Sequence, residues 1–159
     1  MMLLSREDGL TLVEMLVAVA ISSMVAAGLA TALHQFLTTS ERTRVAQAAL
    51  HDVQNTGHWL NIDGKMATST DLADGSPASD AMTLTWTVDA VVHNTTYFQD
   101  GTELRRDYDG AVISVARNVT DVNFSRSGRL ITVNLESSPP GRWNVSKNAT
   151  FNIWVRTVN

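Results

Sequence analysis

The sequence predicts an α+β protein in which one long amino-terminal helix is followed by an antiparallel β-sheet. Three observations support this class. A stretch of mostly apolar residues from Leu10 to Leu37 carries a single ionised side chain, Glu14. Helical spacing of apolar residues then continues to about Met66, and beyond residue 80 apolar residues recur at every second position. A repeat of about 3.6 residues is typical of a helix, whereas a repeat of two is typical of a strand.

The first half of the expected helix is apolar on all sides. About 20 apolar residues suffice to cross the hydrocarbon core of a bilayer, so residues 10–37 are predicted to form a transmembrane or filament-core helix. A carboxylate inside such a helix is energetically costly. The presence of Glu14 therefore indicates that this helix does more than anchor the chain in a membrane.

The second half of the expected helix, residues 38–67, is amphipathic. Its small and apolar residues recur at spacings of four and three, which places them on one face: Ala46, Leu50, Val53, Gly57, Leu60, Gly64 and Ala67. We expect this face to lie on the sheet, with Trp59 and Ile62 also packed inside. The alternative end of the helix is Asp63-Gly64, because glycine disfavours helix continuation.

The remaining residues, 68–159, are expected to form a β-rich globular domain. Residues 68–80 are rich in small polar residues and turn formers, which indicates a loop. Six or seven antiparallel strands are expected after it, in one sheet or two layers, because successive hairpins have no helix between them. The predicted strands are 82–88, 91–98, 102–108, 112–114, 119–124, 130–136 and 150–156, with turns at 99–101, 109–110 and 127–128.

Composition excludes several classes of function. The formal net charge is −4, so the chain offers no clear electrostatic signal for nucleic acid. Cysteine is absent, which excludes disulfides and thiolate metal sites. The sequence contains no nucleophile elbow, no phosphate-binding glycine loop and no paired-carboxylate motif, so we predict that the protein is not an enzyme and uses no cofactor.

Two groups of residues were considered as metal ligands. His51 and His58 are seven residues apart and share a helix face, but no carboxylate completes a ligand set. Asp71, Asp74 and Asp80 lie in the expected loop, at a spacing that fits no ordered calcium template. The histidines are interpreted as solvated helix residues, and we predict no metal site.

The amino-terminal motif carries a family resemblance. Gly9, followed by Leu10-Thr11-Leu12-Val13-Glu14 and a long apolar run, resembles the cleavage and methylation motif of type IV prepilins and of the pseudopilins of type II secretion. Leu10 stands where the family usually has phenylalanine. The resemblance implies a type IV pilin-like fold, with residues 1–9 as a leader that prepilin peptidase removes after Gly9.

The resemblance also implies partners and a location. Leu10 would become the methylated first residue, and Glu14 would be the fifth residue of the mature chain. The expected partners are the membrane, prepilin peptidase, an inner-membrane assembly platform, and other minor and major pilins or pseudopilins. The chain would be a single-pass membrane protein with an extracytoplasmic carboxy-terminal domain, later part of a pilus or pseudopilus.

The motif also suggests how Glu14 acts. After cleavage, the Leu10 ammonium and the Glu14 carboxylate lie about one helical turn apart. In an apolar filament core, Glu14 can pair with the terminal amine of a neighbouring subunit only at the correct axial stagger. Buried polar pairs of this kind add little net stability but fix register.

A looser resemblance covers part of the second half. Leu104-Arg105-Arg106 and the segment 115–124 are similar to minor pilins of the W type and to the J-type minor pseudopilin of type II secretion. This similarity implies a minor subunit at the tip or in the initiating complex of the filament. The residue types also have a simpler interpretation, in which Val119 and its neighbours are core residues and both arginines are solvated.

Four alternatives stay open at this point. Arg6, the apolar run and a small-residue site at 30–32 would also suit a conventional secretory signal with Leu33 as first mature residue. A plain single-pass anchor would retain Met1. The chain could also be a membrane-anchored binding module for DNA or a secreted substrate, whereas an anchored enzyme is the least supported alternative.

Overall fold

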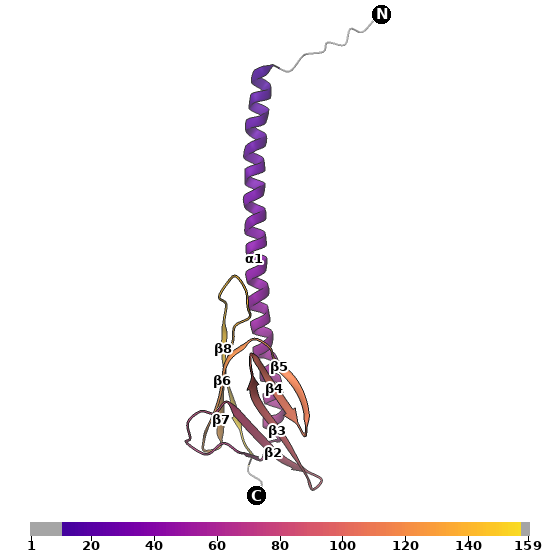
Figure 1. Ribbon diagram of the computed structural model, residues 1–159, viewed down its shortest axis with the longest axis vertical. Coiled ribbons are helices and arrows are strands. Elements are labelled where there is room, and N and C mark those ends of the chain that lie inside the picture. Colours follow the sequence, from indigo (N-terminus) through magenta and orange to yellow (C-terminus); the bar gives the residue numbers. More distant parts are fainter. Residues whose placement is uncertain (1–10, 157–159) are drawn as a thin grey trace, which may run out of the picture. The chain divides into compact units, whose positions relative to one another are not determined.

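A computed structural model describes residues 11–156 (Figure 1). The predicted α+β class is confirmed, with one long helix and antiparallel strands. The helix is α1 (Leu12–Met66). The strands are β1 (Ser69–Thr70), β2 (Ala81–Val88), β3 (Val91–Asp100), β4 (Glu103–Tyr108), β5 (Ala111–Ala116), β6 (Val119–Ser127), β7 (Leu130–Ser137) and β8 (Lys147–Trp154).

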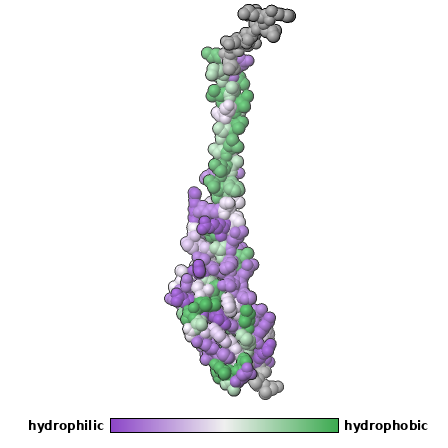
Figure 2. All heavy atoms as spheres, turned by 90° about the vertical axis from the view of Figure 1, so that its right-hand side faces the viewer, coloured by the Kyte–Doolittle hydropathy of each residue, from purple (hydrophilic) through white to green (hydrophobic). Residues whose placement is uncertain are grey.

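The described residues fall into two compact units, which divide between Glu41 and Arg42. In the first unit, the side chains of residues 11–37 are almost all exposed, and most are apolar, as Figure 2 shows in green. Helix α1 is long and apolar enough to cross a membrane, judged by length and composition. A solvent-exposed apolar surface of this extent is a docking surface for lipid or for other helices.

The second unit contains two antiparallel sheets. One has the strand order β1-β2-β3-β4-β5 and the other the order β6-β7-β8, so neighbours in the sequence are neighbours in the sheets. The turns predicted before β4, β5 and β7 are present, and Gly101, Gly110 and Gly128 adopt positive φ in them. The small strand β1 lies inside the segment that was expected to be a loop, and β8 begins three residues before the expected strand at 150–156.

The core of the second unit lies where the helix and both sheets meet. Side chains that alternate along the strands face inward, as the repeat of two predicts. The largest fully buried apolar side chains are Leu60, Met82, Leu84, Tyr97, Leu104, Val119, Phe124, Ile131 and Val133.

The buried face of α1 differs from the predicted face by one residue between residues 45 and 56. Val45, Ala49, Asp52 and Thr56 are buried, whereas Leu50 is 44% exposed. One residue corresponds to a rotation of about 100° on a helix. The apolar spacing gave the wrong positions between residues 45 and 56 because Asp52 and Thr56 are buried polar residues with hydrogen-bond partners. Farther along the chain, Leu60, Gly64 and Ala67 are buried as predicted.

The helix continues through Asp63-Gly64, so the alternative end at this dipeptide is wrong. Asp63 is fully buried and bonded to the sheet. Gly64 lies directly against Ile153 of β8, and Gly57 lies against Phe151 of the same strand. The two glycines let the helix and β8 approach closely, which offsets the low helix propensity of glycine.

We expect Gly64→Ala to lower the free energy of unfolding by about 1–3 kcal/mol, the usual range for overpacking. A Cβ atom at this position would overlap the Cγ2 methyl of Ile153. Gly28→Ala is the matched control, because no atom lies within 4 Å of a Cβ placed there. Chemical unfolding of the full chain in detergent, followed by tryptophan fluorescence, measures both. Equal stability of Gly64→Ala and wild type would contradict the close packing.

Candidate functional site

Glu14 caps the amino-terminal end of α1. Thr11 precedes the first helical residue, and its backbone N–H and its hydroxyl both donate to Glu14 Oε2 at 2.9 Å. The Glu14 N–H donates back to Thr11 Oγ1 at 3.3 Å. This reciprocal arrangement is a capping box, which satisfies donors that the first helical turn leaves unpaired. Sequence reasoning missed it, although Thr-x-x-Glu before an apolar run is the signal for it.

The capping box leaves one carboxylate oxygen open. Both bonds from Thr11 end on Oε2, and Glu14 Oε1 has no hydrogen-bond partner among residues 11–156. An ionised carboxylate accepts up to about four hydrogen bonds. Glu14 can therefore cap its own helix and bind a further cationic donor. Gly9 and Leu10, the predicted processing residues, lie outside the described residues.

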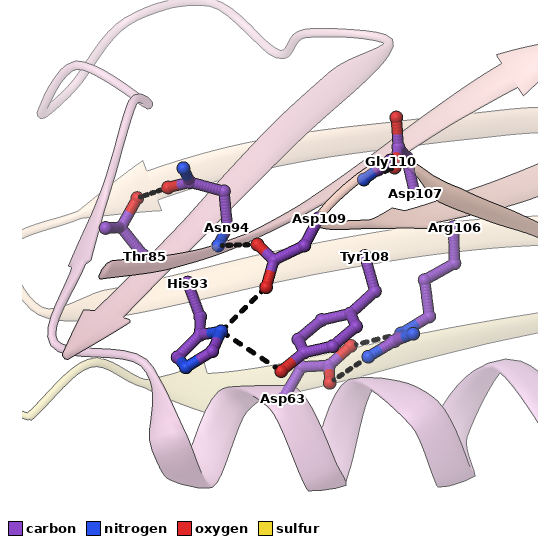
Figure 3. Close-up of polar contacts among 9 residues, drawn as sticks. All are labelled: Asp63, Thr85, His93, Asn94, Arg106, Asp107, Tyr108, Asp109 and Gly110. Atoms are coloured by element: carbon purple, nitrogen blue, oxygen red, sulfur yellow. Dashed lines mark hydrogen bonds and ion pairs between the residues drawn. The ribbon is translucent and has the colours of Figure 1, made fainter. Parts of the chain in front are cut away.

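A buried ion pair joins the end of the helix to the larger sheet (Figure 3). Arg106 of β4 donates from Nε and Nη2 to the two oxygens of Asp63, each at 2.7 Å. The Tyr97 hydroxyl of β3 donates to the same carboxylate. Asp63 and Tyr97 are fully buried and Arg106 is nearly so. A bidentate arginine pair with a third donor satisfies a buried carboxylate well.

Aromatic rings surround this arginine. Its guanidinium carbon lies 4.6 Å from the ring centroid of Trp59 and 5.1 Å from that of Tyr108. The hydrogen bonds to Asp63 raise the pKa of Arg106 above its usual value, and burial raises the pKa of Tyr97. Arg106 therefore stays protonated and charged, and the Tyr97 hydroxyl keeps its proton. Both can then go on donating to the Asp63 carboxylate and hold the helix to the sheet.

The expectation that Arg105 and Arg106 are both solvated is right for Arg105 and wrong for Arg106. Arg105 forms exposed ion pairs with Asp100 and Glu103 at 3.2 and 3.3 Å. Arg106 points to the opposite face of β4, the face that carries the buried Leu104. Alternation along the strand was the available signal, because residues 104 and 106 share a face.

A second buried carboxylate, Asp52, joins the helix to the smaller sheet. Its oxygens accept the backbone N–H groups of Arg117 and Asn118, both at 3.2 Å. They also accept Asn118 Nδ2 and Ser137 Oγ, both at 2.9 Å. Nearby, Asn55 Nδ2 donates to the Val115 carbonyl at 2.7 Å. These bonds fix the turn between β5 and β6 against the helix.

A more exposed polar group lies near the start of β3. His93 Nδ1 is 2.6 Å from Asp109 Oδ2 and 3.2 Å from the Tyr108 hydroxyl (Figure 3). The ring of Trp86 stacks with those of His93 and Tyr108. The backbone N–H of Asn94, together with His93, holds the pKa of Asp109 below its usual value. The contacts stabilise the turn at Asp109.

The residues considered as metal ligands do not form a site within residues 11–156, where no group of three or more potential ligands is present. His51 and His58 are exposed. Asp71 and Asp74 accept backbone N–H groups of Thr83 and Gly128 at 2.8 and 2.6 Å. These aspartates hold loops in place.

The comparisons with known proteins give one match. Residues 4–30 match the prokaryotic N-terminal methylation motif, and this stretch contains Gly9, Leu10 and Glu14. Comparison with curated proteins and with solved structures gave no match. The matched segment fits a structural protein and membrane anchoring. The chain thus carries the prepilin-type cleavage and methylation motif of type IV pilins and pseudopilins, in an α+β structure of type IV pilin-like architecture.

Proposed function

We propose that the chain is a minor pilin or minor pseudopilin, processed by prepilin peptidase between Gly9 and Leu10. It joins the tip or the initiating complex of a type IV pilus or a type II secretion pseudopilus. Before assembly, helix α1 anchors it in the inner membrane with the carboxy-terminal domain on the extracytoplasmic side. Other pilins and the inner-membrane assembly platform are its partners.

The observation that carries this proposal is the position of Glu14. It is the third residue of an exposed apolar helix and the only ionisable residue of that helix before His34. Its oxygen Oε1, which has no hydrogen-bond partner among residues 11–156, suits the terminal ammonium that cleavage would create on a neighbouring subunit. Because each residue advances a helix by about 1.5 Å, this pairing is satisfied at one axial stagger only. Glu14 would thereby select the register in which subunits dock.

The variant Glu14→Gln separates register from capping. Glutamine replaces glutamate in capping boxes, so the helix end keeps its cap while the negative charge is lost. We expect Glu14→Gln to be processed normally but to enter filaments about tenfold to a hundredfold less, since a charged hydrogen bond contributes about 1.5–3 kcal/mol. Co-purification with partner pilins, compared with the amount in membranes, measures this.

Thr11→Val is the matched control, because it removes the hydroxyl of the cap and leaves Glu14 ionised. It should enter filaments far better than Glu14→Gln. Wild-type incorporation of Glu14→Gln would mean that capping alone explains the glutamate. Amino-terminal sequencing of the native protein tests processing directly: Leu10 as first residue supports the proposal, Leu33 would identify a secretory signal, and an intact Met1 would identify a plain anchor.

A further inference from the structure

Three arginines surround a small cavity at the edge of the second unit. Arg126, Arg129 and Arg156 line a cavity of about 130 Å³, which we call the triple-arginine cavity. The other lining residues are Thr68, Ser69, Thr70 and Val155, so hydroxyl groups accompany the guanidinium groups and no carboxylate lines the wall. A concentration of positive charge in a chain of net charge −4 requires a physical explanation.

Two of the guanidinium groups are held in place by backbone carbonyls. Arg126 donates from Nε to the Gly128 carbonyl at 2.8 Å and from Nη1 to the Leu72 carbonyl at 3.0 Å. Arg129 donates from Nε and Nη2 to the Val155 carbonyl at 3.1 and 3.0 Å. A guanidinium has five N–H donors, so each group retains several for a ligand. Groups fixed before binding lose little conformational entropy on binding.

The charges of these arginines are not neutralised within the described part of the chain. No carboxylate oxygen of residues 11–156 lies within 4.0 Å of a nitrogen of Arg126, Arg129 or Arg156. Asp74 Oδ1 accepts the Gly128 N–H at 2.6 Å. The positive charges that face one cavity repel one another. A bound anion would be attracted to each of them and would offset this repulsion.

A larger pocket adjoins the cavity through Arg156, which lines both. This pocket has a volume of about 450 Å³, a size typical of small-ligand sites. Lys65 adds a further positive charge to its wall, and the indole of Trp154, 66% exposed, adds a flat apolar surface. An anionic group in the triple-arginine cavity could therefore carry an organic group that lies in the adjoining pocket.

We propose that the triple-arginine cavity binds a phosphate group. Planar guanidinium groups match the oxygens of phosphate in bidentate pairs, which makes arginine the side chain best suited to this ligand. Ser69 and Thr70 also line the cavity, and a serine or threonine hydroxyl can donate to a phosphate oxygen. The phosphate group belongs either to a free anion or to a lipid headgroup, and both offer the same chemistry to the arginines. The inference is independent of the proposed role in a filament.

The experiment uses the full chain in a nonionic detergent and isothermal titration with two probes, inorganic phosphate and short-chain phosphatidylglycerol. Arg156→Gln is the main variant, because no hydrogen bond to another residue is made by its side chain within residues 11–156. We expect it to weaken phosphate binding about tenfold, the effect of one charged hydrogen bond. Arg142→Gln is the matched control, since it removes the same charge from an exposed site elsewhere.

The outcomes are distinguishable. Loss of binding in Arg156→Gln with normal binding in Arg142→Gln supports the proposal, and equal loss in both would assign binding to overall charge and overturn it. Binding of phosphatidylglycerol alone identifies a lipid headgroup, and binding of inorganic phosphate alone identifies a free anion. If wild type binds neither probe, the proposal is wrong. Should Arg156→Gln fail to fold, Arg156→Lys is the second variant. It keeps the positive charge but loses the planar guanidinium that can bind two phosphate oxygens, so it must still weaken binding.

Discussion

Replacing Asp63 by alanine is expected to lower the free energy of unfolding by about 3–5 kcal/mol, the range for removing one partner of a buried ion pair. The substitution leaves Arg106 charged and nearly buried without the carboxylate that binds both its Nε and Nη2. It also leaves the buried Tyr97 hydroxyl without its acceptor. Denaturant unfolding of the full chain in detergent measures the loss.

Two further variants test the reason for this loss. Arg105→Ala removes an exposed arginine on the same strand, and it should change stability by no more than about 0.5 kcal/mol. The double variant Asp63→Leu with Arg106→Met replaces both charges by apolar groups, and it should recover much of the stability that Asp63→Ala loses. If the double variant is as unstable as Asp63→Ala, the loss comes from packing or from the Tyr97 hydroxyl, which lacks an acceptor in both variants, and the explanation by an unpaired charge is wrong.

The second large effect is expected at Asp52. Asp52→Asn keeps the shape of the side chain but replaces one acceptor oxygen by an NH₂ group, whereas all four recorded partners of Asp52 are donors. At least one donor must then lose its acceptor in a buried place. We expect the free energy of unfolding to fall by about 1–3 kcal/mol, the cost of an unsatisfied buried group.

Asp80→Asn provides the comparison for Asp52→Asn, since Asp80 is exposed and the chemical change is the same. It should be within about 0.5 kcal/mol of wild type. Hydrogen exchange adds a local measurement, because the amides of Arg117 and Asn118 should exchange faster in Asp52→Asn. Unchanged exchange at both amides would contradict the role assigned to this carboxylate.

Much of the fold could be predicted from the sequence because the spacing of apolar residues indicates which side chains are buried. The end of α1 at Met66, the hairpin turns with glycine and most strand positions follow from that periodicity. The buried face between residues 45 and 56 did not follow, because Asp52 and Thr56 lie on it. Polar residues are expected at exposed positions, and only their hydrogen-bond partners allow them to be buried. Asp52 binds donors of the β5–β6 turn and of β7, and Thr56 donates to the Asp52 carbonyl.

The candidate site divides in the same way. Gly9, Leu10 and Glu14 could be singled out because their motif is contiguous, and the match at residues 4–30 bears out the recognition of that motif. The triple-arginine cavity could not be predicted, since Arg126 and Arg129 belong to the β6–β7 hairpin whereas Arg156 follows β8, and Arg156 joins them only when β7 pairs with β8. Local sequence patterns do not show which residues from distant parts of the chain come into contact.

The close contact of Gly57 and Gly64 with β8 has a consequence for how the chain is made. The side chains that fill these positions, Phe151 and Ile153, belong to the last strand, whereas the helix is translated first. The ribosome must therefore release β8 before this face of the helix is covered. Contacts so distant in sequence form slowly, so this face of the helix stays open while β2 to β7 are being made.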